Sequence, residues 1–130
     1  MPANGSKVVL KKGCKPVVIE ITIGQAQWGR YKITLWDSDG HKFEPVGEGL
    51  NYDQVPDFFE INKSIASLKD RLLSWDVAIA PLGNGKSELY SLVVRISQGG
   101  QVVPGGSIVD TGQLDGGIFL SDFVTIDIAQ

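Results

Sequence analysis

Hydrophobic and polar residues alternate along two neighbouring segments in the first third of the chain. In both segments every second residue is apolar: Val17, Ile19, Ile21 and Ile23, then Tyr31, Ile33 and Leu35. Side chains of a strand point alternately to its two faces, so this period of two predicts two half-buried strands. We expect the strands to pair in one sheet, with Ile21 opposite Ile33 and with Glu20 beside Lys32 on the polar face.

The same alternation is strongest between residues 72 and 98, where two apolar rows flank Asn84-Gly85. The rows are Leu73, Trp75, Val77 and Ile79, then Tyr90, Leu92, Val94 and Ile96. Asn-Gly is the preferred sequence of a two-residue hairpin turn. The pattern therefore predicts a hairpin in which Trp75 lies opposite Val94 in the core, while Asp76 and Arg95 are neighbours on the outer face.

A second turn is indicated by Asp37-Ser38-Asp39-Gly40. The aspartates suit a type I turn and the glycine accepts a positive φ, as in a three-residue hairpin loop. A loop of that length places Phe43 opposite Leu35, in the core.

The remaining segments carry weaker signals. We expect an irregular connection over 45–57, a short strand over 58–61, and a short helix over 63–70 that Asn62 caps. The glycine-rich segment 99–117 predicts mainly loops, and 123–128 predicts a last strand. Together these elements predict a single all-β domain over residues 1–130. The expected fold is an antiparallel two-sheet sandwich of jelly-roll or Ig-like type, with a partly closed barrel as the alternative.

Composition and charge narrow the classes of function. With 42% hydrophobic and 21% charged residues the chain is of ordinary globular composition. Its net charge of -3 argues against a nucleic-acid partner, and the basic run over 7–15 is interpreted as an edge strand protected by lysines. No apolar stretch has the length of a membrane span, and no signal peptide is evident, so the default expectation is the cytoplasm.

One short segment resembles the phosphate-binding loop of P-loop nucleotide hydrolases. It is Ala80-Pro81-Leu82-Gly83-Asn84-Gly85-Lys86-Ser87, preceded by an apolar strand. The resemblance implies that Lys86 contacts phosphates and that Ser87 holds magnesium. The chain after Ser87 is too short to add the β-α units of that family, so we interpret the match as coincidental.

A second segment, Ile108-Val109-Asp110-Thr111-Gly112, resembles the catalytic segment of aspartic proteases. In that family the motif comes early in the chain, whereas here it lies near the end, and we expect a surface turn. These two resemblances cover about eight and five residues, and no family is recognised across the chain.

Candidate metal ligands and nucleophiles are few. Calcium is the one cofactor that the sequence leaves open, with Asp37 and Asp39 as one weak cluster and Asp110 and Asp115 as another. A single histidine, His41, and a single cysteine make no recognisable catalytic set, so we expect no enzymatic activity.

The tryptophans give the best indication of a binding site. Trp36 shares a strand face with polar residues and Trp28 lies in a predicted loop, near Gln25, Gln27, Asp37 and Asp39. Exposed tryptophans stack on sugar rings or anchor protein partners, although the 45–57 connection could equally cover Trp36. The leading hypothesis is a non-catalytic interaction module, a subunit or accessory of a larger assembly that binds a protein partner or itself. The alternative is a lectin-like module that binds glycans, with or without calcium.

Overall fold

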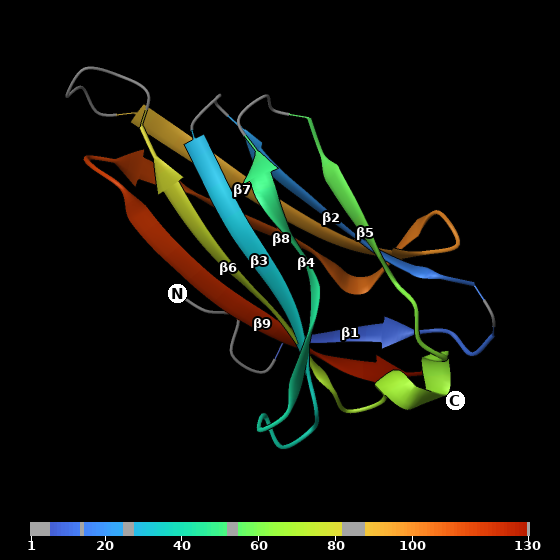
Figure 1. Ribbon diagram of the computed structural model, residues 1–130. Coiled ribbons are helices and arrows are strands. Elements are labelled where there is room, and N and C mark those ends of the chain that lie inside the picture. Colours follow the sequence, from blue (N-terminus) through green and yellow to red (C-terminus); the bar gives the residue numbers. More distant parts are fainter. Residues whose placement is uncertain (1–5, 14, 25–27, 52–54, 82–87, 130) are drawn as a thin grey trace.

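The protein is a sandwich of two β-sheets (Figure 1). The computed structural model describes residues 6–13, 15–24, 28–51, 55–81 and 88–129. The five strands of sheet A lie in the order β1 (Lys7–Leu10), β9 (Ile118–Ile128), β6 (Leu72–Ala80), β3 (Trp28–Trp36) and β4 (Phe43–Asn51). The four strands of sheet B lie in the order β5 (Asp57–Ile61), β2 (Val17–Gly24), β7 (Glu88–Gln98) and β8 (Gln101–Leu114). Two separate sheets confirm the predicted sandwich over the partly closed barrel.

The core lies between the sheets and is built from the alternating apolar rows. Ile19 and Ile21 of β2, Leu73 and Trp75 of β6 and Val94 of β7 are all buried. Full burial of one such side chain contributes about 1.5–3 kcal/mol relative to its exposure. The predicted burial of these rows, including Trp75, is therefore confirmed.

The predicted partners of the first two strands are wrong. β2 belongs to sheet B, where Ile21 lies opposite Val94, whereas β3 belongs to sheet A. Glu20 accordingly pairs with Arg95, at 3.1 Å from Oε2 to Nη1, and not with Lys32. Alternation fixes the face that a strand turns to the core, and it does not fix which strand lies beside it.

The predicted hairpin over 72–98 is wrong for the same reason. β6 pairs with β3 and β9 in sheet A, while β7 pairs with β2 and β8 in sheet B. Asp76 is thus not a neighbour of Arg95, and it accepts a hydrogen bond of 2.5 Å from the Ser121 hydroxyl. The turn residues Asn84-Gly85 lie outside the described residues. The prediction that the row from Tyr90 to Ile96 lies on a strand is confirmed.

Two segments expected to be irregular are strands. Residues 45–51 belong to β4, and the glycine-rich segment forms β8. Gly99 and Gly100, both with positive φ, make the turn between β7 and β8, where Gln98 pairs with Gln101. Gly105 also has a positive φ, and a Cβ there would lie 1.9 Å from the Lys7 carbonyl oxygen. These glycines serve a turn and a close approach of two strands, so they do not mark a loop.

Phe43 and the short helix also differ in detail from expectation. The β3–β4 turn closes with the Asp37 amide donating to the Lys42 carbonyl, so Phe43 pairs with Trp36 and points outward, 60% exposed. The helix is a single 3-10 turn, Ile65–Leu68, whose N-cap is Ser64 and not Asn62.

The basic N-terminal run contains an edge strand, as predicted. β1 pairs with β9 in parallel at the edge of sheet A. Val8 and Leu10 of β1 are buried, while Lys7, Lys11 and Lys12 are exposed. Within the described parts of the chain, no helix has the length and apolar character that a membrane crossing needs.

Candidate interaction surface

The outward-facing aromatic residues are gathered on one sheet. On sheet A they come from three strands and are Trp28, Trp36, Phe43, Phe119 and Phe123. In the described part of sheet B, Phe58 of β5 is the one aromatic side chain on the outer face. We call the solvent-facing side of β4, β3, β6 and β9 the outer face of sheet A.

At one end of this face, aromatic rings border a shallow groove. Trp36 packs against Phe43 with ring centroids 5.2 Å apart, and its indole Nε1 donates a hydrogen bond of 2.8 Å to Ser74 Oγ. The groove beside them has a volume of about 330 Å³ and is lined by Trp36, Phe123 and the polar side chains of Ser74, Asp76 and Ser121, among others. This end therefore combines aromatic surface with hydroxyl and carboxylate groups.

A polar row crosses the middle of the face. The strand register places Glu48 of β4, Lys32 of β3, Asp76 of β6 and Ser121 of β9 side by side. The charges therefore alternate in sign across the sheet, in the order negative, positive, negative.

The far end of the face is again apolar. The register aligns Leu50, Arg30, Ala78 and Phe119, and beyond them Trp28 lies beside Ala80. Phe119 is 68% exposed and Trp28 is 53% exposed. Large apolar side chains this accessible commonly mark a contact surface.

The structure separates the two tryptophans that the sequence singled out. Both lie on the outer face of sheet A, but they occupy opposite ends of β3. Eight residues of strand put them about 26 Å apart at roughly 3.3 Å per residue. The interpretation that the 45–57 segment covers Trp36 is wrong, because residues 45–51 form β4 beside it. Gln25 and Gln27 lie outside the described residues.

Asp37 stabilises a turn. Its carboxylate accepts hydrogen bonds from the backbone amides of His41, at 3.0 Å, and Lys42, at 3.3 Å. These bonds, that of His41 first, lower the pKa of Asp37 below its usual value. Asp39 is exposed in the same turn.

The weak calcium candidates are not brought together. Asp37 and Asp39 follow β3 at its Trp36 end, whereas Asp115 precedes β9 at the opposite end of the sheet, and Asp110 lies within β8. The described residues include no group of three or more His, Cys, Asp or Glu that could hold a metal ion.

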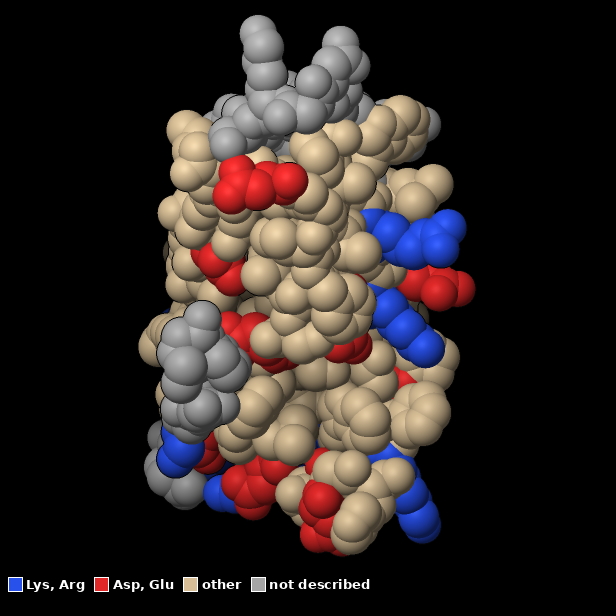
Figure 2. Space-filling view, turned by 90° about the vertical axis from the view of Figure 1, so that its left-hand side faces the viewer, with Lys and Arg blue, Asp and Glu red and all other residues tan. Residues whose placement is uncertain are grey.

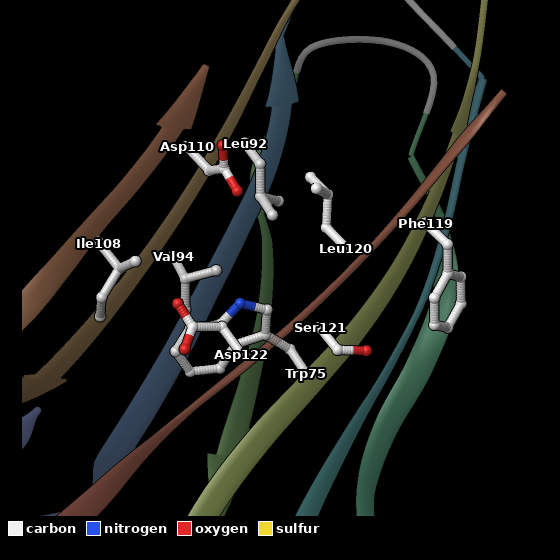
Figure 3. Close-up of a pocket in the computed structure, with 9 residues that line it drawn as sticks. All are labelled: Trp75, Leu92, Val94, Ile108, Asp110, Phe119, Leu120, Ser121 and Asp122. Atoms are coloured by element: carbon white, nitrogen blue, oxygen red, sulfur yellow. The ribbon is translucent and has the colours of Figure 1, made fainter. Parts of the chain in front are cut away.

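The segment that resembles an aspartic protease is a strand, so the predicted surface turn is wrong. Asp110 lies opposite Leu92 in β8 and faces a cavity of about 210 Å³ between β8 and β9 (Figure 3). The Tyr90 hydroxyl donates to Asp110 Oδ1 at 3.2 Å; burial, and then this carboxylate, raise the pKa of Tyr90. Asp122 of β9 also lines the cavity, and Phe119 lies on the other side of β9.

Figure 2 shows the side of the molecule that lies at the left in Figure 1, where β9 runs. Its surface is mostly uncharged, with acidic side chains scattered over it and basic side chains mainly toward the margins.

The P-loop resemblance lacks the helix that it needs. Lys86 and Ser87 lie outside the described residues, but the segment that follows them is β7 and not a helix. Phosphate binding by such a loop relies on the amides at a helix N-terminus. The resemblance therefore has no structural support from the described segment that follows it.

Sequence reasoning missed several residues of the outer face, namely Phe43, Leu50, Phe119 and Phe123. Phe119 could have been found, because it lies between Ile118 and Leu120, which continue the apolar row of β9 toward its start. That row is interrupted by Asp122, which hid the first half of the strand.

Comparisons with known proteins give no match. No protein family, no curated protein and no solved structure matches this chain significantly. Functional inference therefore depends on the geometry of the molecule.

Proposed function

We propose that this protein is a non-catalytic interaction module, a subunit or accessory of a larger assembly, which binds another protein chain through the outer face of sheet A. The observation that carries the proposal is the unequal distribution of outward aromatic residues, five on sheet A against Phe58 alone in the described part of sheet B. Tryptophan and other aromatic residues are enriched where protein interfaces gain most of their binding energy.

The arrangement of the face supports a protein partner. Apolar groups at both ends of the face, Trp36 with Phe43 and Trp28 with Phe119, offer surface whose burial favours association. Between them, the row that contains Lys32 and Asp76 would fix the orientation of the partner, because complementary charges select one register over others.

The inward carboxylates fit a structural role. Asp110 lies on β8, the edge of sheet B, and Asp122 lies on the half of β9 that β1 does not cover. Inward-pointing charges on edge strands are a common means of preventing sheets from pairing with other chains. This explanation accounts for the two carboxylates that line the cavity without assigning chemistry to them.

The proposal is tested by capture with matched variants. Phe119→Ser removes one exposed aromatic residue from the outer face of sheet A, and Phe58→Ser removes a similarly exposed one from sheet B. The tagged wild-type protein and each variant are recovered from the cells that make the protein naturally, and the bound proteins are quantified by mass spectrometry. We expect at least one bound protein to be recovered with both the wild-type protein and Phe58→Ser but not with Phe119→Ser. Equal recovery with Phe119→Ser would refute the proposal.

A second candidate function is carbohydrate binding, favoured by the groove beside Trp36. An aromatic platform next to Ser74, Asp76 and Ser121 offers an apolar surface together with hydrogen-bonding groups, as small-ligand sites commonly do. A glycan array probed with and without calcium tests this candidate. Binding that Trp36→Ala abolishes would support it, and an array without hits in both conditions would remove it.

A further inference from the structure

We propose that the partner bound by the outer face of sheet A is a second copy of the same chain. The two faces would pack about a two-fold axis that runs parallel to the strands, between β3 and β6. This inference rests on the proposed function and names its partner. The pattern of charge and side-chain size across the face supports this arrangement.

The central row is complementary to itself in this arrangement. Rotation about a line between β3 and β6 places β3 over β6 of the second copy, and β4 over β9. Lys32 then faces Asp76 of the second copy, Asp76 faces the second Lys32, and Glu48 faces Ser121. Isologous interfaces require this kind of self-complementary patch.

Two other two-fold axes in the plane of the face bring like charges together. An axis along β3 would place Lys32 on itself and Glu48 on Asp76 of the second copy. An axis across the strands, along the central row, would place each charge on its own copy. Like charges in contact disfavour association, so the axis between β3 and β6 is favoured over these two. An axis between β3 and β4 would also pair Lys32 with Glu48, but it would leave β6 and β9 of each copy outside the contact.

Side-chain sizes also agree with this axis. Large residues face smaller ones: Trp28 faces Ala80, Arg30 faces Ala78, and Phe43 faces Thr125. Leu50 faces Phe119, which adds an apolar contact on each side of the axis. Stacked sheets keep their strands within about 30° of each other, so the register is closest near the central row.

The two central charges are available for such contacts. Lys32 is exposed, and among the described residues neither Lys32 nor Asp76 takes part in a salt bridge within the chain. Asp76 accepts a hydrogen bond from Ser121 and retains the lone pairs of its second oxygen.

Two oppositely charged variants test the arrangement. Lys32→Asp makes all three charged positions of the central row acidic, and Asp76→Lys places two lysines at its centre. Sedimentation velocity of the wild-type protein up to high micromolar concentration should show a dimer. Each variant alone should dimerise at least about tenfold more weakly, because like charges then meet across the axis.

Mixing the two variants is the decisive step. In the mixture, every central contact between the two chains joins an acidic and a basic side chain. Within each variant, positions 32 and 76 still carry like charges, so only contact between the chains can restore the pairing. Native mass spectrometry should therefore show a heterodimer. Glu60→Lys, on the exposed face of β5, makes the same change in charge as Asp76→Lys and should leave dimerisation unchanged. Circular dichroism checks that each variant is folded.

The outcomes separate this inference from the proposed function. A wild-type chain that stays monomeric, or a mixture that forms no heterodimer, overturns the second copy as the partner. The broader proposal would then still stand if Phe119→Ser lost a foreign protein that Phe58→Ser retained, and it would fail if neither variant changed what is captured.

Discussion

Two glycines of β4 make room for aromatic rings that close one side of the sandwich. A Cβ on Gly47 would lie only 2.3 Å from the Phe59 ring, and a Cβ on Gly49 would lie 2.8 Å from the Tyr31 hydroxyl oxygen. The two rings meet edge to face, with centroids 5.9 Å apart, and the Tyr31 hydroxyl donates to Asp57 of β5. The packing between β4 and β5 therefore depends on the absence of side chains at these two positions.

Gly47→Ala should destabilise the protein by about 1–3 kcal/mol, because the added methyl group forces the Phe59 ring out of place. Urea unfolding followed by tryptophan fluorescence measures the change. Gly116→Ala is the matched control, since no atom lies within 4 Å of a Cβ built there. Equal unfolding midpoints for Gly47→Ala and the wild-type protein would show that β4 and β5 do not pack as described.

Among the elements, the β3–β4 turn decides which side chains at the start of β4, before its bulge, face outward. A turn one residue shorter would have placed Phe43 in the core, whereas the observed turn pairs it with Trp36 on the outer face. The carboxylate of Asp37 holds this turn through the amides of His41 and Lys42. One aspartate therefore helps to set the aromatic character of the surface.

The contribution of Asp37 should depend on pH. The pKa of Asp37 is lower in the folded protein than in the unfolded chain, where it is about 4. The ionised carboxylate therefore stabilises the fold at pH values above the unfolded pKa, and this stabilisation is lost as the pH falls through the folded pKa. Asp37→Ala should therefore lower stability more at pH 7 than at pH 2.5, as measured by urea unfolding. Asp39→Ala leaves the hydrogen bonds from the His41 and Lys42 amides to Asp37 in place, so its effect on stability should depend less on pH. If Asp37→Ala lowered the free energy of unfolding equally at both pH values, this role would be contradicted.

The sequence was informative about strands and uninformative about their neighbours. Alternation identified the buried rows of β2, β6 and β7, because burial on one face imposes a period of two on any strand. It could not show that consecutive strands such as β6 and β7 belong to different sheets, since a chain that crosses the sandwich keeps the same period. Glycine-rich β8 was mistaken for loops because Gly105 serves a close contact with β1 that no local pattern reveals.

At the scale of the whole molecule, the two outer faces differ in character. The sequence predicted a surface tryptophan site but could not assemble it, because the face depends on the register of four strands that are distant in the chain. Trp36 was identified from its own strand alone. Phe119 and Leu50 join the same surface only through the order of strands in sheet A.

Photo-crosslinking in living cells tests most directly whether this face is the contact surface. A photoreactive phenylalanine analogue is placed at Phe119 on sheet A or at Phe58 on sheet B, two positions of similar exposure. We predict covalent protein adducts from position 119 and few or none from position 58, and the mass of each adduct tells a second copy from another protein. An absence of adducts at position 119, or equal yields at the two positions, would contradict the account.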